Sequence, residues 1–306
     1  MASDASHATA SRTFGLICAA LGAFGFAFKA VLVKAAYRYG VDATTLLALR
    51  MAYALPFFLL MGLAAERRAA ERLTRSDWLG LAVLGLLGYY ASSYLDFLGL
   101  RHISAGLERV ILFTYPTMVV VFSALLQRQR LPAAVLRALA LCYVGVACAV
   151  AQDFRAGGDA VWWGCTLVFA SALCYAAYLM LSGPLLQRLG STRVAAWATA
   201  VASLLALLQF TALRPVAALA QPWQVQLLSL AMALFSTVLP IWLSAEAIRR
   251  LGAGTTAIIG SLGPIFTMLL AAAFLGESLG LLPCIGAALV IIGVRQVATA
   301  NAVRKA

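Results

Sequence analysis

Two stretches of sequence decide the fold: residues 105–116 read AGLERVILFTYP, and residues 253–264 read AGTTAIIGSLGP. A shift of 148 residues superimposes the Ala-Gly openings and the final prolines, and it also aligns Gly145 with Gly293 without a gap. Sequence that recurs in register over such a distance indicates two copies of one structural unit. The chain is therefore predicted to consist of two homologous halves.

The composition places both halves in a membrane. Hydrophobic residues make up 63% of the 306 residues and charged residues 11%, whereas soluble chains are roughly half apolar and a quarter charged. Windows of about 20 apolar residues, long enough to cross a bilayer, recur ten times, at 13–37, 43–64, 77–99, 105–127, 133–151, 158–182, 192–213, 223–248, 255–274 and 279–298. The sequence predicts an all-α integral membrane protein with ten transmembrane helices.

The two copies are predicted to have opposite orientations in the membrane. Each copy holds five helices, and because five is odd, the second copy must enter from the other side. We expect a first repeat at 13–151 and a second, inverted repeat at 158–298, flanked by short segments at 1–12 and 299–306. Inverted repeats are typical of transporters, in which one half rocks against the other around a site at the bilayer midplane.

The positive charges predict which side each loop faces. With the N-terminus inside, fifteen of the 23 Lys and Arg residues fall in cytoplasmic loops or tails and five fall outside. Such an excess is typical of the cytoplasmic side, so both termini are predicted to be cytoplasmic. Residues 1–12 make a poor secretory signal, and we expect the first helix to be retained. The net charge of +12 is thereby explained by topology, with the lipid bilayer as partner and no nucleic acid.

Several classes of site are disfavoured by the residues that they need. The six cysteines lie in apolar stretches without a Cys-x-x-Cys pair, and there are two histidines, so no metal, cofactor or disulfide framework is expected. An intramembrane enzyme is disfavoured because no His-Glu-x-x-His motif and no pair of deep aspartates occurs. A passive channel and a structural or sensor subunit remain alternatives, and the protein is expected to be a monomer or a homodimer.

Several motifs carry a resemblance to a known family. They are Arg50 within LLALRMA, the Ala-Gly openings at 105 and 253, the prolines Pro116 and Pro264, GESL at 276–279, and Gly-Val at 145 and 293. With them the chain resembles the drug/metabolite transporter superfamily, in its ten-helix branch with two EamA repeats. One departure is that the first copy has Arg-Gln-Arg at 128–130, so the family's usual acidic residue survives only as Glu277.

The resemblance implies a transporter of the bacterial inner membrane that exports a small metabolite from the cytoplasm. Amino acids are a frequent cargo of the superfamily, and the chain looks closest to bacterial aromatic amino acid exporters. The resemblance leaves a multidrug exporter and a sugar-phosphate or nucleotide-sugar carrier as alternatives. The basic residues within the spans would suit a phosphate, but two acidic residues nearby count against so anionic a cargo.

Five ionisable residues lie within the outer halves of predicted helices: Lys29, Arg50, Asp96, Glu108 and Arg109. Each costs roughly 2.5 to 3.5 kcal/mol to insert and therefore needs a partner, water or a function. One interpretation is a salt-bridge cluster that neutralises itself. The other is that Lys29 or Arg50 binds a cargo carboxylate in the cavity, while the remaining three help to close an outer gate. Asp96 and Glu108 are also possible proton carriers.

Prolines and aromatic residues complete the candidate site. Pro116 and Pro264 lie near the centres of their predicted helices and are expected to kink them, with Gly260 as a further flexible point. The expected cavity lining consists of aromatic residues, namely Phe24, Phe28, Tyr90, Tyr94, Tyr115, Tyr175, Tyr178 and Trp242. Simple packing within the bundle is the alternative explanation for both groups.

Overall fold

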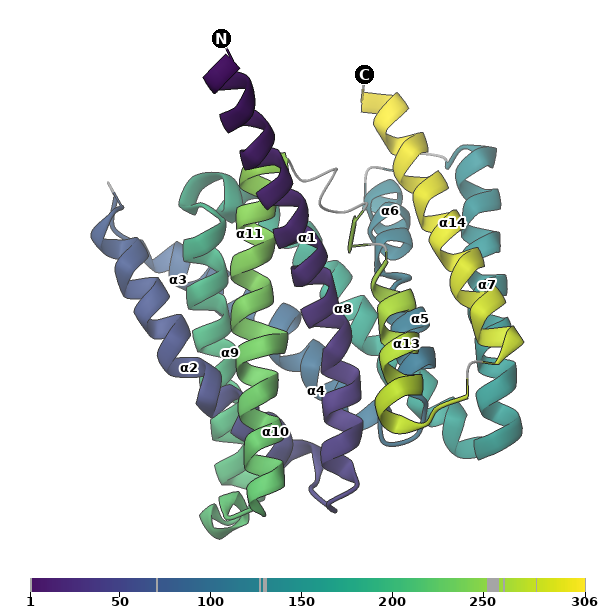
Figure 1. Cartoon of the computed structure of the whole chain (residues 1–306). Helices are drawn as coiled ribbons and strands as arrows, with labels where there is room; N and C mark the ends of the chain where they lie inside the picture. Colours follow the sequence, from purple (N-terminus) through teal and green to yellow (C-terminus); the bar gives the residue numbers. More distant parts are fainter. Residues whose placement is uncertain are drawn as a thin grey trace.

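The computed structural model describes residues 2–69, 71–126, 128, 131–251, 259–260, 262–278 and 280–305. Within these ranges every regular element is a helix, and the helices form one bundle with both termini at the same end (Figure 1). Eight segments are long and apolar enough to cross a membrane, and two shorter apolar helices follow at Gly263–Leu275 and Leu281–Gln296. The predicted architecture of ten membrane helices in two five-helix repeats is confirmed.

The elements follow the order expected for a duplicated unit. The first repeat contains α1 (Ala2–Tyr37), α2 (Ala43–Arg67), α3 (Arg75–Leu84), η1 (Gly85–Ala91), α4 (Ser92–Gly99), α5 (Ala105–Leu112), α6 (Tyr115–Leu126) and α7 (Ala133–Gly157). The second contains α8 (Asp159–Leu189), α9 (Ser191–Leu213), η2 (Val216–Leu219), α10 (Trp223–Ala233), η3 (Leu234–Val238), α11 (Leu239–Leu251), α13 (Gly263–Leu275) and α14 (Leu281–Lys305). We call the end of the bundle opposite the termini the distal end.

The fourth span is interrupted, which corrects the prediction of a single kinked helix. α5 ends at Leu112 and α6 begins at Tyr115, so Pro116 is the second residue of a new helix. Pro264 likewise is the second residue of α13. The physical reason is that proline suits the first turn of a helix, where its missing N–H would have no partner. Residues 253–254, 129–130 and 279, which belong to the repeat and family motifs, lie outside the described residues.

Two π-helical segments occupy equivalent positions in the repeats. η1 interrupts the third span and η3 the eighth, and a shift of 148 residues brings residues 86–90 onto 234–238. Glycines allow neighbouring helices to approach η1 closely, because a Cβ on Gly88 would lie 2.4 Å from Tyr178 Cγ. Hydropathy alone did not predict either segment.

The fifth and tenth spans, α7 and α14, lie side by side in Figure 1. Their backbones meet at two glycines: a Cβ on Gly145 would lie 2.6 Å from the carbonyl oxygen of Gly286, and a Cβ on Gly286 would lie 2.5 Å from that of Gly145. Small residues permit such close contact between membrane helices. The last helices of the two repeats are therefore locked together by backbone contact.

At the distal end, Asp42 caps α2. It accepts hydrogen bonds from the backbone N–H groups of Thr44 and Thr45 and from the Thr45 hydroxyl. Burial alone would raise the pKa of Asp42, but these hydrogen bonds and the nearby Arg214 guanidinium outweigh it and lower the pKa. The cap therefore stays ionised at neutral pH and fixes the start of α2.

Candidate functional site

Four of the five predicted ionisable residues meet in one place. Lys29 Nζ on α1 lies 2.6 Å from Asp96 Oδ2 on α4 and 3.3 Å from Glu108 Oε1 on α5. Arg109 Nε lies 4.0 Å from Glu108 Oε2. The side chains of Asp96 and Glu108 are 1% and 0% exposed. We call Lys29, Asp96, Glu108 and Arg109 the buried charge cluster; it joins three helices of the first repeat.

Arg109 connects this cluster to the second repeat. Its Nε donates to the hydroxyl of Thr267 on α13 over 3.1 Å, and its Nη2 donates to the carbonyl oxygen of Phe26 on α1. The Thr267 hydroxyl in turn donates to the carbonyl oxygen of Ala27. Arg109 therefore holds α1, α5 and α13 together at the level of the charges.

Arg50, the fifth ionisable residue, is differently placed. Its side chain is buried, its Nε donates to the Thr237 hydroxyl in η3 over 3.0 Å, and its guanidinium lies 5.5 Å from the centre of the Phe97 ring. Its Nη1 is buried without a hydrogen-bond partner, and within the described part of the chain Arg50 makes no ion pair. Whereas Lys29 is balanced by two carboxylates, Arg50 keeps an uncompensated charge.

Three of the five predicted tyrosines form a cluster between the two repeats. The ring centres of Tyr115 and Tyr175 lie 4.9 Å apart, and those of Tyr175 and Tyr178 lie 5.5 Å apart. Tyr89 extends the group through a hydroxyl–hydroxyl distance of 3.1 Å to Tyr178. These four residues come from η1, α6 and α8, and we call them the tyrosine cluster.

The predicted phenylalanines pack elsewhere, at the contact between α1 and α13. Phe24 and Phe28 have ring centres 6.2 Å apart, and they meet Phe266 and Phe274 edge to face at 5.9 and 5.6 Å. Trp242, on α11, is 51% exposed and belongs to neither aromatic group. The structure thus divides the predicted aromatic lining into separate sets.

Tyr90 and Tyr94 form a third aromatic pair. Their rings stack with centres 6.4 Å apart, and the Tyr94 hydroxyl lies 3.4 Å from Thr44 Oγ1. Both tyrosines pack against the same apolar core as Phe97, whose ring faces Arg50. Phe28 packs against this core as well, so three of the predicted aromatic residues share it with Phe97.

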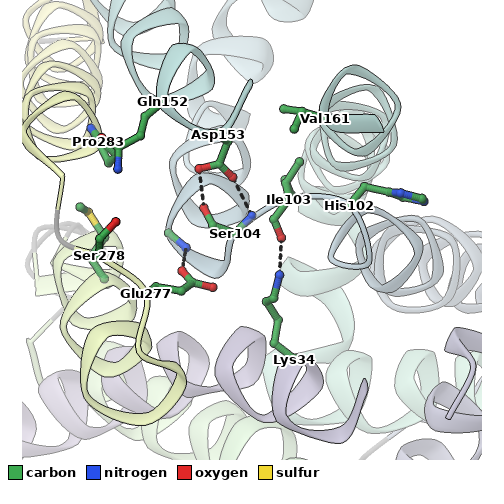
Figure 2. Close-up of a pocket in the computed structure, with 12 residues that line it drawn as sticks. Lys34, His102, Ile103, Ser104, Gln152, Asp153, Val161, Glu277, Ser278 and Pro283 are labelled. Atoms are coloured by element: carbon green, nitrogen blue, oxygen red, sulfur yellow. Dashed lines mark hydrogen bonds between the residues drawn. The ribbon is translucent and has the colours of Figure 1, made fainter. Parts of the chain in front are cut away.

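A pocket of about 450 Å³ opens at the distal end, lined in part by Lys34, Ser104, Asp153 and Glu277. Figure 2 shows Asp153, Glu277 and Lys34 approaching the start of α5 from three different elements. Asp153 accepts hydrogen bonds from the Ser104 backbone N–H and hydroxyl, over 2.7 and 3.0 Å. Lys34 Nζ donates to the carbonyl oxygen of Ile103 over 2.8 Å.

Glu277 completes the cap of α5 from the second repeat. Its Oε1 accepts the Ala105 N–H over 3.0 Å and its Oε2 accepts the Gly106 N–H over 3.4 Å. The Leu107 N–H is taken by the Ser104 hydroxyl, so the first four donors of the helix are all satisfied, as a helix start requires. Gly276, at φ 71°, turns the chain after α13 and brings Glu277 to this position.

Sequence reasoning missed the roles of Asp153, Lys34 and Thr237. Asp153 and Lys34 lie at the ends of apolar spans, where charged residues are expected at the membrane surface and attract no notice. Thr237 is uncharged and lies 187 residues from its partner Arg50. The family pattern did single out Glu277, as the one copy of its usual acidic residue that this chain retains. The pattern did not indicate that Glu277 caps a helix.

Comparison with known proteins gives a consistent result. The model of the EamA-like transporter family matches residues 13–151 and 162–299. The chain is 32% identical over 281 residues to the Bacillus subtilis (strain 168) protein named "Uncharacterized transporter YcbK", covering 89% of this chain and 88% of the relative. It is 25% identical over 231 residues to "Uncharacterized transporter YyaM" of the same organism, covering 72% and 73%.

A solved crystal structure of another protein has the same fold. It superimposes with a TM-score of 0.62 at 18% identity and covers 96% of this chain and 98% of its own. At that identity the likeness shows the fold alone. It extends over both repeats, because nearly the whole length of each chain is matched.

Proposed function

Because the chain belongs to the EamA-like transporter family, we propose that it exports amino acids with aromatic or other apolar side chains by alternating access. The family makes it a multi-pass membrane transporter. We propose the bacterial inner membrane as its location, with the distal end outside, because fifteen Lys and Arg residues fall on the side of the termini and five on the other.

The observation that carries the proposed cargo is the uncompensated charge of Arg50. Three cations, Lys29, Arg50 and Arg109, lie near two carboxylates, Asp96 and Glu108, so one positive charge is in excess. A single cargo carboxylate would balance it and supply the missing acceptor for Arg50 Nη1. A phosphate carries nearly two negative charges, which is more than the single excess positive charge of the site. The charge therefore favours an amino acid over a sugar phosphate.

The surroundings of Arg50 favour an apolar side chain on the cargo. Phe97 stacks under the guanidinium, and Tyr90 and Tyr94 pack against the same apolar core. Flat rings of this kind bind aromatic groups by offset or edge-to-face contacts worth about 0.5 to 1.5 kcal/mol beyond area burial. An aromatic amino acid would therefore satisfy both the charge and the apolar surface.

The ammonium group of the cargo has candidate partners at the helix breaks. Pro116 and Pro264 have no N–H, so the carbonyl groups of Leu112 and Gly260 lack the usual donor four residues on. Carbonyl groups at broken helices coordinate cations in other transporters with inverted repeats. The two breaks occupy equivalent positions in the repeats, and we propose them, with Gly260, as the hinges of alternating access. The buried charge cluster would then act as the distal gate.

Counterflow in proteoliposomes tests this function. Vesicles that contain purified protein and unlabelled L-phenylalanine should accumulate labelled L-phenylalanine from outside. Arg50→Gln should lower the initial rate by at least about tenfold, because a lost charged hydrogen bond costs about 1.5 to 3 kcal/mol. Arg214→Gln is the matched control, since Arg214 is an exposed distal arginine that pairs with Asp42, and it should keep the wild-type rate. Lys29→Ala applies the same counterflow test to Lys29, the other residue expected from the sequence to bind the cargo carboxylate.

Each outcome separates the proposal from a rival. Wild-type counterflow in Arg50→Gln at equal expression would refute the binding role of Arg50. Accumulation of sugar phosphates or cationic dyes in place of amino acids would identify the cargo as one of the alternative classes. Leak of L-phenylalanine without exchange would identify a passive channel.

A further inference from the structure

The first two spans of each repeat pack on the other repeat. In the first repeat, α1 packs on α11 and α13, and α2 packs on α10. In the second repeat, α8 packs on α4 and α6, and α9 packs on η1. The bundle therefore contains two bodies that each combine helices of both repeats. We call the group around α1 and α2 the first body, with α10, η3, α11 and α13, and the group around α8 and α9 the second body, with α3, η1, α4, α5 and α6.

The two bodies meet along α2 and α9, which pack against each other in antiparallel directions (Figure 1). We call the end of the bundle where the chain termini lie the terminal end. The interface carries one ion pair at each end, between Glu66 and Arg193 at the terminal end and between Asp42 and Arg214 at the distal end. A shift of 148 residues brings Glu66 onto Arg214, so the two repeats place opposite charges at equivalent positions.

The pair at the terminal end is the stronger one. Arg193 Nε donates to Glu66 Oε1 over 2.5 Å and Arg193 Nη2 donates to Oε2, while Trp197 Nε1 donates to Oε1 over 3.0 Å. At the distal end Arg214 Nε lies 3.5 Å from Asp42 Oδ1, and the Arg214 side chain is 47% exposed, against 7% for Arg193. A bidentate arginine–carboxylate pair is strong, whereas an exposed pair contributes little. Charge therefore holds this interface mainly at its terminal end.

The buried charge cluster cannot have a charged equivalent at the terminal end. In the distal half the cluster joins the two bodies, because Lys29 belongs to the first and Asp96 to the second. A shift of 148 residues brings Asp96 onto Ser244 and Arg109 onto Ala257, so the second copy lacks the charges to repeat this contact. A different contact between the bodies is needed to close the terminal end.

We propose that Glu66, Arg193 and Trp197 form a latch between the two bodies, which closes the terminal end and opens before cargo enters from that side. This inference rests on the proposed function, because it gives alternating access a terminal counterpart of the distal gate. When the bodies separate, water solvates both charges, and the Glu66 side chain is already 28% exposed. Because the latch stabilises only the terminal-closed state, its loss shifts the population toward the terminal-open state.

Ser203 on α9 provides a position from which opening can be measured without any cargo. It is fully buried, and its hydroxyl lies 3.6 Å from Met51 Sδ on α2. It follows Trp197 by six residues, a rise of about 9 Å toward the distal end. Ser203→Cys is close in size to the native residue, and a water-soluble thiol reagent reaches it from the terminal end only when α2 and α9 separate there.

Labelling of Ser203→Cys is compared in inside-out membrane vesicles, which expose the cytoplasmic face, and in spheroplasts, which expose the outer face. Mass spectrometry of the labelled peptide separates this cysteine from the six native ones. Adding Glu66→Gln should raise the labelling rate at least about tenfold in inside-out vesicles, because the latch loses its charged hydrogen bonds, and should not raise it in spheroplasts. An unchanged rate in the vesicles, or an equal rise from both faces, would overturn the proposal.

Arg188→Gln is the matched control. Arg188 pairs with Asp77 at the same end of the bundle, but α8 and α3 belong to the same body, so Ser203→Cys should keep its labelling rate. Charge exchange then separates a latch from structural damage. Arg193→Glu should raise the rate by placing two carboxylates opposite each other, and Glu66→Arg combined with Arg193→Glu should bring the rate back toward that of the native pair. A double variant that labels faster than either single variant would refute the latch.

Transport distinguishes failure of the latch from failure of the proposed function. Apparent affinity is reduced by the fraction of protein in the competent state, so Glu66→Gln should lower the KM for uptake of L-phenylalanine into inside-out vesicles by up to about tenfold, and Arg188→Gln should not. Transport of L-phenylalanine with an unchanged KM in Glu66→Gln would overturn the latch and leave the proposed function intact. Labelling that rises from the cytoplasmic face in Glu66→Gln, in a protein that moves no L-phenylalanine, would support the latch and refute the proposed cargo.

Discussion

The glycine contact between α7 and α14 allows a quantitative prediction about stability. Gly145→Ala places a Cβ 2.6 Å from the carbonyl oxygen of Gly286, where ordinary contacts begin at 3.4 Å. The two helices must therefore separate by up to about 0.8 Å, because backbone cannot rotate away as a side chain can. Overpacking of this kind costs about 1 to 3 kcal/mol. For a chain of this size the midpoint of thermal unfolding should fall by about 2 to 5 °C.

Gly80→Ala is the matched control for this prediction. Gly80 also lies inside a helix, so both variants gain the same intrinsic helix propensity of about 0.5 to 1 kcal/mol. Its new Cβ would meet only the side chain of Leu185, with Cδ1 at 2.9 Å and Cδ2 at 3.1 Å, and the end of a leucine side chain can move. Unfolding of purified protein in detergent, followed by tryptophan fluorescence, compares the two. Equal midpoints for Gly145→Ala and Gly80→Ala would refute the close backbone approach. A second test is the double variant Gly145→Ala with Gly286→Ala: one separation of the helices should relieve both clashes, so the two losses of stability should not add in full. Full additivity of these losses would also refute the close approach.

Three further predictions concern individual side chains. Glu277→Ala should lower the stability by about 2 kcal/mol in the same unfolding assay, because two backbone N–H groups of α5 lose their acceptor, and Glu277→Gln should lower it less. Thr237→Val should lower it by about 1 to 3 kcal/mol by leaving Arg50 Nε buried without an acceptor, whereas Thr237→Ser should behave as wild type. Asp42→Ala should cost about 1 kcal/mol at neutral pH; because the native pKa of Asp42 is lowered, this difference should shrink as acid protonates the wild-type cap.

Hydropathy and repeat register predicted the helix count and the duplication, because both depend on local composition. The break before Pro116 was not predictable in the same way, since a proline can bend a long helix or begin a new one. Here the hydroxyls of Thr114 and Thr117 donate to the carbonyl oxygens of Ile111 and Thr114. The helix can therefore end here without leaving these two carbonyl oxygens without a hydrogen-bond donor. Whether threonine does this depends on its three-dimensional surroundings.

The candidate site was predictable to the extent that charge is costly in a membrane. That cost identified Lys29, Asp96 and Glu108 without any structure, and these three are in contact. The pairing itself was not predictable, because the sequence does not say which of the three cations Lys29, Arg50 and Arg109 the carboxylates contact. Arg50 has a neutral partner, Thr237, and a threonine inside an apolar helix is too common to be noticed.

The cap that Glu277 provides for α5 has a consequence for the ancestry of the protein. If two separate five-helix chains once formed this bundle, each had to offer an acid to its neighbour. The first copy has Gln129, which carries no carboxylate, at the position equivalent to Glu277. A gene that kept only the first half would encode α5 without its partner. The first half thus depends on the second for the carboxylate that caps α5.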